Sequence, residues 1–219
     1  AFEQAVPTRV SASWGHSNGC NITGHDSRNN EEYVTMVLAT LISGAGATPN
    51  QDGWHACGPE CCMGALASGD VELIEYSYPI ILHRYSLMTD SGGAGKFRGG
   101  SGTCWQVEPL DKPMTFVMFG EGRKYPALGS AGAFSTLLDT KVGRVEITRN
   151  GKVEVIKENV IETILPGQRV ANMNPGGGGY GNPLERPIKK VILDVKNGLV
   201  SRKGAQEDYG VVFSDKESL

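Results

Sequence analysis

Two glycine-rich stretches constrain this chain more than any other feature of its sequence. Residues 90–102 contain six glycines in thirteen positions, and residues 174–183 contain five in ten. Glycine inside a helix or strand costs roughly 0.5–1 kcal/mol relative to alanine, so runs this dense are not expected in regular structure. Each stretch is therefore predicted to be a shaped loop that either binds a ligand through its bare N–H groups or packs closely against another segment.

The first loop also carries two cations between its glycine clusters. Lys96 and Arg98 stand close to Gly93 and Gly95, and backbone N–H groups beside a cation can hold a carboxylate or a phosphate. These four residues are the candidate substrate- or anion-binding set. Neither loop has the spacing of a P-loop or of a dinucleotide fingerprint. Structural packing of the loop, or pairing of its cations with a carboxylate elsewhere in an assembly, is the favoured alternative.

The overall composition excludes several classes of function. With 219 residues and a net charge of -3, the chain offers no electrostatic case for binding nucleic acid or an anionic membrane. No apolar run approaches the roughly 20 residues that a membrane span needs, and no leader pattern is present, so we expect a cytoplasmic protein.

Five cysteines, two of them adjacent, make a poor disulfide framework and favour reduced thiols. The chain opens without methionine, so we expect a piece of something longer.

Strand-like segments precede helical ones, which predicts an α+β fold. Asn150-Gly151 is the strongest hairpin signal, because this pair suits both positive-φ positions of a type I′ turn. The expected strand segments are Tyr33–Ile42 (buried on both faces), Asp70–Met88 (broken or kinked at Pro79), Thr103–Val107, Met114–Phe119, Arg144–Arg149, Lys152–Ile156 and Ile161–Val170 (with Pro166-Gly167 inside it).

Two short helices are expected near the C-terminus, over Pro187–Asn197 and Ser201–Tyr209. The first has proline at its start, and the second has Ser201 as N-cap and Gly210 as terminator. The predicted organisation is a β-rich body over residues 1–183, which carries both long glycine-rich loops, with a helical segment over residues 184–219 packed on it.

The segment from Trp54 to Gly64 contains the most reactive side chains. The segment offers four side chains of the types that bind zinc, namely His55, Cys57, Cys61 and Cys62. They all lie within eight residues, whereas structural zinc sites usually use two separated pairs of ligands. Buried thiols that pack like alanine are therefore the alternative to zinc at Cys57, Cys61 and Cys62. A reactive thiolate needs a neighbouring cation or a helix N-terminus to lower the pKa of its thiol. His55 stands close to Cys57 in the sequence, so a reactive thiolate at Cys57 is a further interpretation. The candidate catalytic residues are His55, Cys57 and His16, the last from a polar, turn-rich stretch.

Both glycine stretches resemble signatures of one known family. Residues 91–102 and 175–183 are similar to the two glycine motifs of the hydantoinase B/oxoprolinase family, and residues 194–201 with 208–212 resemble its C-terminus. Asp70–Glu72, Tyr78-Pro79 and the opening Val6-Pro7 also fit. The resemblance covers nearly the whole chain, but only the C-terminal portion of the longer family members.

This resemblance implies a subunit of an ATP-dependent complex with a small-molecule substrate. The family includes enzymes that open hydantoin and 5-oxoproline rings, and its relatives carboxylate acetone and acetophenone. ATP and Mg²⁺ are expected on a hydantoinase A-type partner, and the N-terminal portion of the B-type subunit is expected as a separate chain. The family's metal-binding residues lie in that portion, so the resemblance assigns no metal ligand here.

Two segments depart from the family pattern. Residues 57–63 and 16–21 differ from those of typical hydrolytic members. A carboxylase of the acetone or acetophenone type, and a non-catalytic structural subunit, therefore remain competing interpretations.

Overall fold

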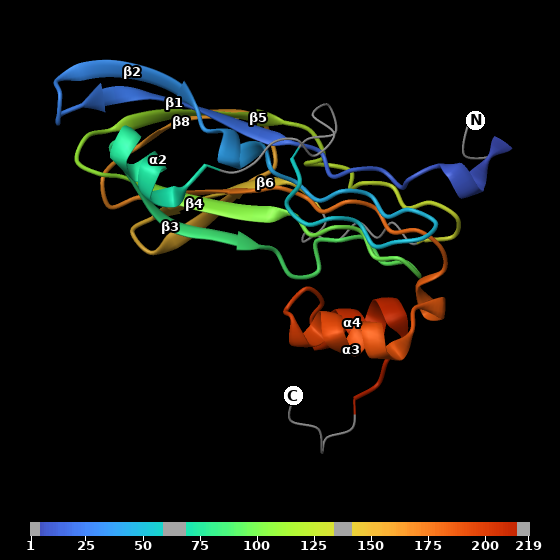
Figure 1. The fold of residues 1–219 in the computed structure, drawn as a ribbon. Coiled ribbons are helices and arrows are strands. Elements are labelled where there is room, and N and C mark those ends of the chain that lie inside the picture. The colour runs from blue at the N-terminus through green and yellow to red at the C-terminus, as the bar shows by residue number, and fades with distance from the viewer. Residues whose placement is uncertain (1–4, 59–68, 134–141, 214–219) are drawn as a thin grey trace.

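Two antiparallel sheets face one another in the computed structural model, which describes residues 5–58, 69–133 and 142–213 (Figure 1). One sheet has the order β2 (Glu31–Met36), β1 (Asn18–Asp26), β5 (Met114–Gly120) and β8 (Val160–Ile164). The other has the order β3 (Ile80–Leu87), β4 (Thr103–Pro109), β9 (Arg169–Met173), β6 (Arg144–Arg149) and β7 (Lys152–Ile156). Together with the helices below, this confirms the α+β fold.

The main hydrophobic core lies between the two sheets. The first sheet contributes alternate residues of β5 to this core (Met114, Phe116 and Met118). The second sheet contributes Trp105 and Val107 of β4. This alternation places one face of each strand in the core, as the two-residue period of a strand requires.

Among the described residues, the helices α2 (Val71–Ser77), α3 (Ile188–Lys196) and α4 (Arg202–Tyr209) lie outside the sandwich. Short 3₁₀ turns are η1 (Pro7–Arg9), η2 (Leu38–Leu41) and η5 (Pro183–Glu185). A second core joins α3 and α4 to the first glycine loop, because Val191, Ala205 and Tyr209 pack with the buried Ala94. Within the described ranges, no helix is long and apolar enough to cross a membrane.

Several local predictions are confirmed. Asn150 and Gly151 have φ values of 51° and 74° in the β6–β7 turn. The Ser201 hydroxyl accepts a hydrogen bond from the Gly204 N–H at 2.9 Å, and Gly210 ends α4 with φ 67°. These features depend on a few neighbouring residues, so the sequence shows them directly.

The prediction of one buried strand over Tyr33–Ile42 is wrong. The strand β2 ends at Met36 and is an edge strand, with Val34 79% exposed, and a 3₁₀ turn follows it. Its apolar residues are not covered on both faces. An apolar run alone does not distinguish an edge strand from a central one.

The prediction of a strand over Asp70–Met88, broken or kinked at Pro79, is wrong in its first half. Residues 71–77 form α2, whose N-terminus is capped because the Asp70 carboxylate accepts hydrogen bonds from the N–H groups of Glu72 and Leu73. The strand β3 begins directly after Pro79, so the chain breaks at this residue, as one of the two alternatives expected, and no strand is kinked there. The predicted β segment Ile161–Val170 forms two strands in different sheets, β8 and β9, with Pro166-Gly167 between them.

Candidate functional site

The two glycine loops pack directly against each other between the sandwich and the C-terminal helices, where extended segments run side by side (Figure 1). The Gly93 N–H donates to the Gly177 carbonyl at 2.8 Å, and the Gly177 N–H donates to the Gly100 carbonyl at 2.9 Å. Phe97 and Tyr180 exchange two backbone hydrogen bonds, at 3.0 and 2.9 Å. The loops therefore satisfy much of each other's backbone without a regular sheet.

The spacing between these backbones explains the density of glycine. A Cβ atom on Gly100 would lie 1.8 Å from the Trp54 carbonyl oxygen, and one on Gly99 would lie 1.9 Å from the Gly177 carbonyl oxygen. Both contacts involve backbone atoms, which cannot rotate away as a side chain can. No residue with a side chain fits at either position without moving the main chain.

Gly93 and Gly95, two of the four predicted anion-binding residues, face the second glycine loop. A Cβ on Gly93 would lie 2.5 Å from the Gly179 nitrogen, and one on Gly95 would lie 2.6 Å from the Tyr180 nitrogen. Binding of an anion at these two glycines remains a prediction; in this structure their surroundings are backbone of the same chain.

Arg98 joins a buried network of charges. Its Nε lies 3.4 Å from Oδ2 of Asp194 on α3, its Nη1 donates to the Gly99 carbonyl at 2.6 Å, and its side chain is 4% exposed. Arg186 holds both Asp52 oxygens at 2.7 and 2.8 Å, and its Nη2 lies 2.8 Å from Asp194 Oδ2. Lys96 is more exposed and pairs with Glu185 at 3.3 Å.

This network ties the first glycine loop to the C-terminal helices. The Asp52 carboxylate also accepts the Arg98 backbone N–H at 2.8 Å. Burial by itself would raise the pKa of Asp52, but the hydrogen bonds and charge of Arg186 outweigh it and hold this pKa below its usual value. Asp52 is therefore ionised at neutral pH and serves as the central anion of the network.

His55 lies beside this network and is half-buried. Its Nδ1 accepts the Ser101 backbone N–H at 3.0 Å, and its Nε2 lies 3.4 Å from Nη2 of Arg98. Burial lowers the pKa of His55, and the Arg98 charge lowers it further. His55 is therefore neutral at pH 7.

Cys57 is buried, and its backbone N–H donates to the Ser43 carbonyl at 2.9 Å. Burial raises the pKa of the Cys57 thiol, so it is protonated at neutral pH. Cys61 and Cys62, the other ligands in the zinc interpretation, lie outside the described residues. Within the described ranges, no three His, Cys, Asp or Glu side chains gather closely enough to hold a metal ion.

The pKa shifts of His55 and Asp52 predict loss of stability on acidification. Both pKa values are lowered in the folded protein, so the unfolded chain takes up protons first as the pH falls. We expect the free energy of unfolding to decline below about pH 6.5 through His55 and again below about pH 4 through Asp52.

Urea denaturation between pH 7.5 and 3.5 measures this dependence. The variant His55→Gln serves as control, because it should flatten only the change between pH 7.5 and 5.5. A free energy of unfolding that stays constant or rises on acidification would contradict the assignment.

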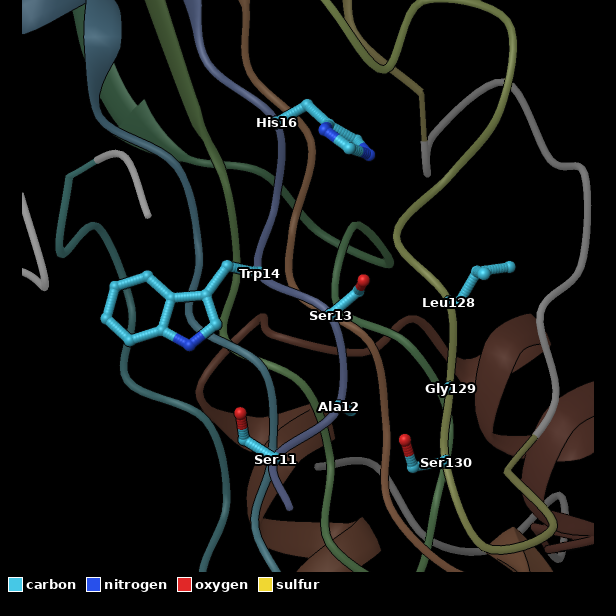
Figure 2. Close-up of a pocket in the computed structure, with 8 residues that line it drawn as sticks. All are labelled: Ser11, Ala12, Ser13, Trp14, His16, Leu128, Gly129 and Ser130. Atoms are coloured by element: carbon cyan, nitrogen blue, oxygen red, sulfur yellow. The ribbon is translucent and has the colours of Figure 1, made fainter. Parts of the chain in front are cut away.

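His16 lines an open cavity of about 480 Å³ between residues 11–16 and 128–130. Figure 2 shows the Ser13 and Ser130 hydroxyls directed into the gap between these two segments, with the His16 ring at one end and the Trp14 ring extending away from Leu128. The His16 ring also borders a second cavity of about 480 Å³, formed with residues 120–125 and 157–159. Its Nδ1 lies 3.7 Å from a Glu121 carboxylate oxygen.

The three candidate catalytic residues are thus not equally placed. His16 borders both of these cavities, whereas His55 and Cys57 line neither. No hydrogen bond or ion pair joins His16 to the other two within the described part of the chain. Arg123, which sequence reasoning did not select, lines the second cavity.

Comparisons with known proteins agree on one family. The model of the hydantoinase B/oxoprolinase family matches residues 1–183. The caprolactamase subunit beta of Pseudomonas jessenii is 61% identical over 222 residues, which cover 100% of this chain and 38% of that protein. The acetophenone carboxylase delta subunit of Aromatoleum aromaticum is 25% identical over 240 residues, covering 96% of this chain and 35% of that subunit.

The likeness extends to three-dimensional structure. The crystal structure of the ATP-dependent caprolactamase from Pseudomonas jessenii superposes with a TM-score of 0.90 at 54% identity, covering 100% of this chain and 38% of that one. The chain therefore spans well under half the length of the relatives it matches.

Proposed function

Since the chain belongs to the hydantoinase B/oxoprolinase family, as its glycine motifs indicated, we propose that it forms part of the B-type subunit of an ATP-dependent complex that opens a cyclic amide. The observation that carries this proposal is the 61% identity to the caprolactamase subunit beta along the full chain. A ring amide of the lactam class is accordingly the proposed substrate. Carboxylation of a ketone is the competing reaction, supported by the 25% identity to the acetophenone carboxylase delta subunit.

The chemistry of an amide explains why such a complex would need ATP. An amide carbonyl is a poor electrophile, because the nitrogen lone pair is delocalised into it. Transfer of the terminal phosphoryl group of ATP to the amide oxygen makes the carbon electrophilic and converts the oxygen into part of a phosphate leaving group. Addition of one water molecule to that carbon and departure of the ring nitrogen as an amine give an acyl phosphate, and a second water molecule releases the carboxylate and inorganic phosphate. We place ATP and Mg²⁺ on a hydantoinase A-type partner, and the remainder of the B-type subunit completes the complex.

Within this proposal, the present chain supplies one wall of the substrate site on a rigid glycine scaffold. His16 is the residue we place towards the substrate, because its side chain is 32% exposed and borders both cavities. An imidazole there can donate or accept a hydrogen bond or move a proton. His55 and Cys57 stay predicted members of the site, as do Lys96, Arg98, Gly93 and Gly95 for anion binding.

Purification of the native complex tests the reaction class. Mass spectrometry should find an A-type ATPase and the rest of a B-type subunit, and the complex should open caprolactam, hydantoin or 5-oxoproline with release of ADP. Turnover without nucleotide would contradict the proposal, and a carboxylated product that requires bicarbonate would favour the competing reaction.

Substitution of His16 tests the role of this chain. We expect His16→Ala to lower kcat by about 10²-fold in the assembled complex, the usual loss for a positioned acid or base. The matched control is His25→Ala, because His25 is comparably exposed on β1 and pairs with Glu32 at 3.2 Å. Unchanged turnover of both variants in an intact complex would favour a structural role for the chain.

A further inference from the structure

Arg123 is a buried cation that the proposed reaction does not use. It follows β5 and is only 6% exposed. Its Nε donates to Asn18 Oδ1 at 2.8 Å, and its Nη1 donates to the Glu158 carbonyl at 2.7 Å. In the described part of the chain, its Nη2 has no hydrogen-bond partner.

No carboxylate neutralises this guanidinium within residues 5–58, 69–133 and 142–213. The other two buried arginines do have carboxylate partners: Arg98 pairs with Asp194, and Arg186 pairs with Asp52 and Asp194. A buried charge without a counter-charge is costly, so proteins pair such groups or use them to bind a ligand. A water molecule could satisfy the hydrogen bond of Nη2 but not the charge.

Other unsatisfied polar atoms lie around Arg123. The Asn18 side chain accepts a hydrogen bond from Arg123 through Oδ1, but its Nδ2 has no partner in the described structure. His16 Nδ1 also has no hydrogen-bond partner there. The amide nitrogen and the arginine nitrogen can only donate hydrogen bonds. Of these three residues, Arg123 and His16 line the neighbouring cavity and Asn18 does not, so Arg123 is the donor that an acceptor oxygen there would satisfy.

The cavity beside Arg123 has room for a ligand that carries such an oxygen. It measures about 480 Å³, and its other lining residues are His16, Gly120–Gly122, Lys124, Tyr125 and Lys157–Asn159. Lys124 and Lys157 add two cations at its rim, and Glu121 and Glu158 add two exposed carboxylates. These four charges are exposed to solvent, whereas the guanidinium of Arg123 is the buried charge of the site.

We propose that this cavity binds an oxyanion, a carboxylate or a phosphate group, with the buried guanidinium of Arg123 as its counter-charge. The site is separate from the anion set predicted at Lys96 and Arg98. It rests on the uncompensated charge and the cavity, so it does not depend on which reaction the complex performs.

Equilibrium dialysis of the complex with labelled inorganic phosphate, in the presence of excess ADP, tests the proposal. Competition with acetate then distinguishes a phosphate site from a carboxylate site. We expect saturable binding of one phosphate per copy of this chain. If the site prefers a carboxylate, acetate should displace this phosphate. Arg123→Gln should weaken the binding by about tenfold or more, as the loss of a charge-assisted hydrogen bond predicts.

Lys124→Ala keeps the test valid if Arg123→Gln does not fold, because Lys124 is exposed at the rim. It should weaken binding severalfold, whereas Lys203→Ala, an exposed site on α4, should not change it. Absence of saturable binding of either anion, or equal binding by wild type, Arg123→Gln and Lys124→Ala, would overturn the proposal.

Discussion

Replacing Gly100 by alanine is expected to destabilise the protein by more than about 3 kcal/mol, beyond the ordinary range for an overpacked core. The new Cβ would lie 1.8 Å from the Trp54 carbonyl oxygen. The main chain cannot shift to relieve this contact cheaply, because the Gly100 N–H donates to Ala45 and the Gly100 carbonyl accepts from Gly177, at 2.8 and 2.9 Å. One methyl group would therefore separate three packed segments.

Urea denaturation followed by circular dichroism measures the effect. Gly69→Ala is the matched control, because its Cβ would lie 3.6 Å from Ile74 Cδ1, an ordinary contact. We expect this control to change the free energy of unfolding by about 1 kcal/mol or less. The account of the glycine loops would be wrong if Gly100→Ala were as stable as Gly69→Ala.

Replacing Arg186 by alanine is expected to cost about 3–5 kcal/mol, the usual result of removing one partner from a buried ion pair. The side chain of Arg186 is 1% exposed, and its guanidinium contacts both Asp52 and Asp194. Its removal would leave Asp194, with a side chain 8% exposed, dependent on the longer contact to Arg98 at 3.4 Å. The contact between α3 and the first glycine loop should weaken as a result.

Hydrogen exchange together with denaturation separates this effect from general destabilisation. We expect amide protection over residues 188–209 to fall more than protection in β4 and β5. Lys96→Ala is the matched control, because Lys96 forms an exposed pair with Glu185 and should cost no more than about 1 kcal/mol. Arg186→Lys should not restore stability, since an ammonium group cannot hold Asp52 through two parallel hydrogen bonds. Equal stability of Arg186→Ala and Lys96→Ala would refute the role of this network.

Local signals in the sequence predicted much of the secondary structure. The Asn150-Gly151 turn and the ends of α3 and α4 formed as expected. Each depends on side chains only a few residues apart. The prediction failed for α2, because the Asp70 cap competes with a β-rich composition. It also failed for Tyr33–Ile42, because coverage by neighbouring strands cannot be inferred from an apolar run.

The candidate site depended much more on tertiary structure. The sequence placed His16, His55, Cys57 and the glycine loops among the notable segments, but it did not show which of them meet. Arg123 escaped selection because nothing local distinguishes a buried arginine from an exposed one.

The sequence by itself determined the family, the short turns and caps, and the need for glycine-rich loops in this protein. The tertiary structure alone decided which charges are paired. Arg186 meets Asp52 across 134 positions, and Arg123 meets Asn18 across 105. Contacts over such separations are set by the packing of sheets and loops, which no short window of residues encodes, and that packing leaves Arg123 buried without a carboxylate in the described structure.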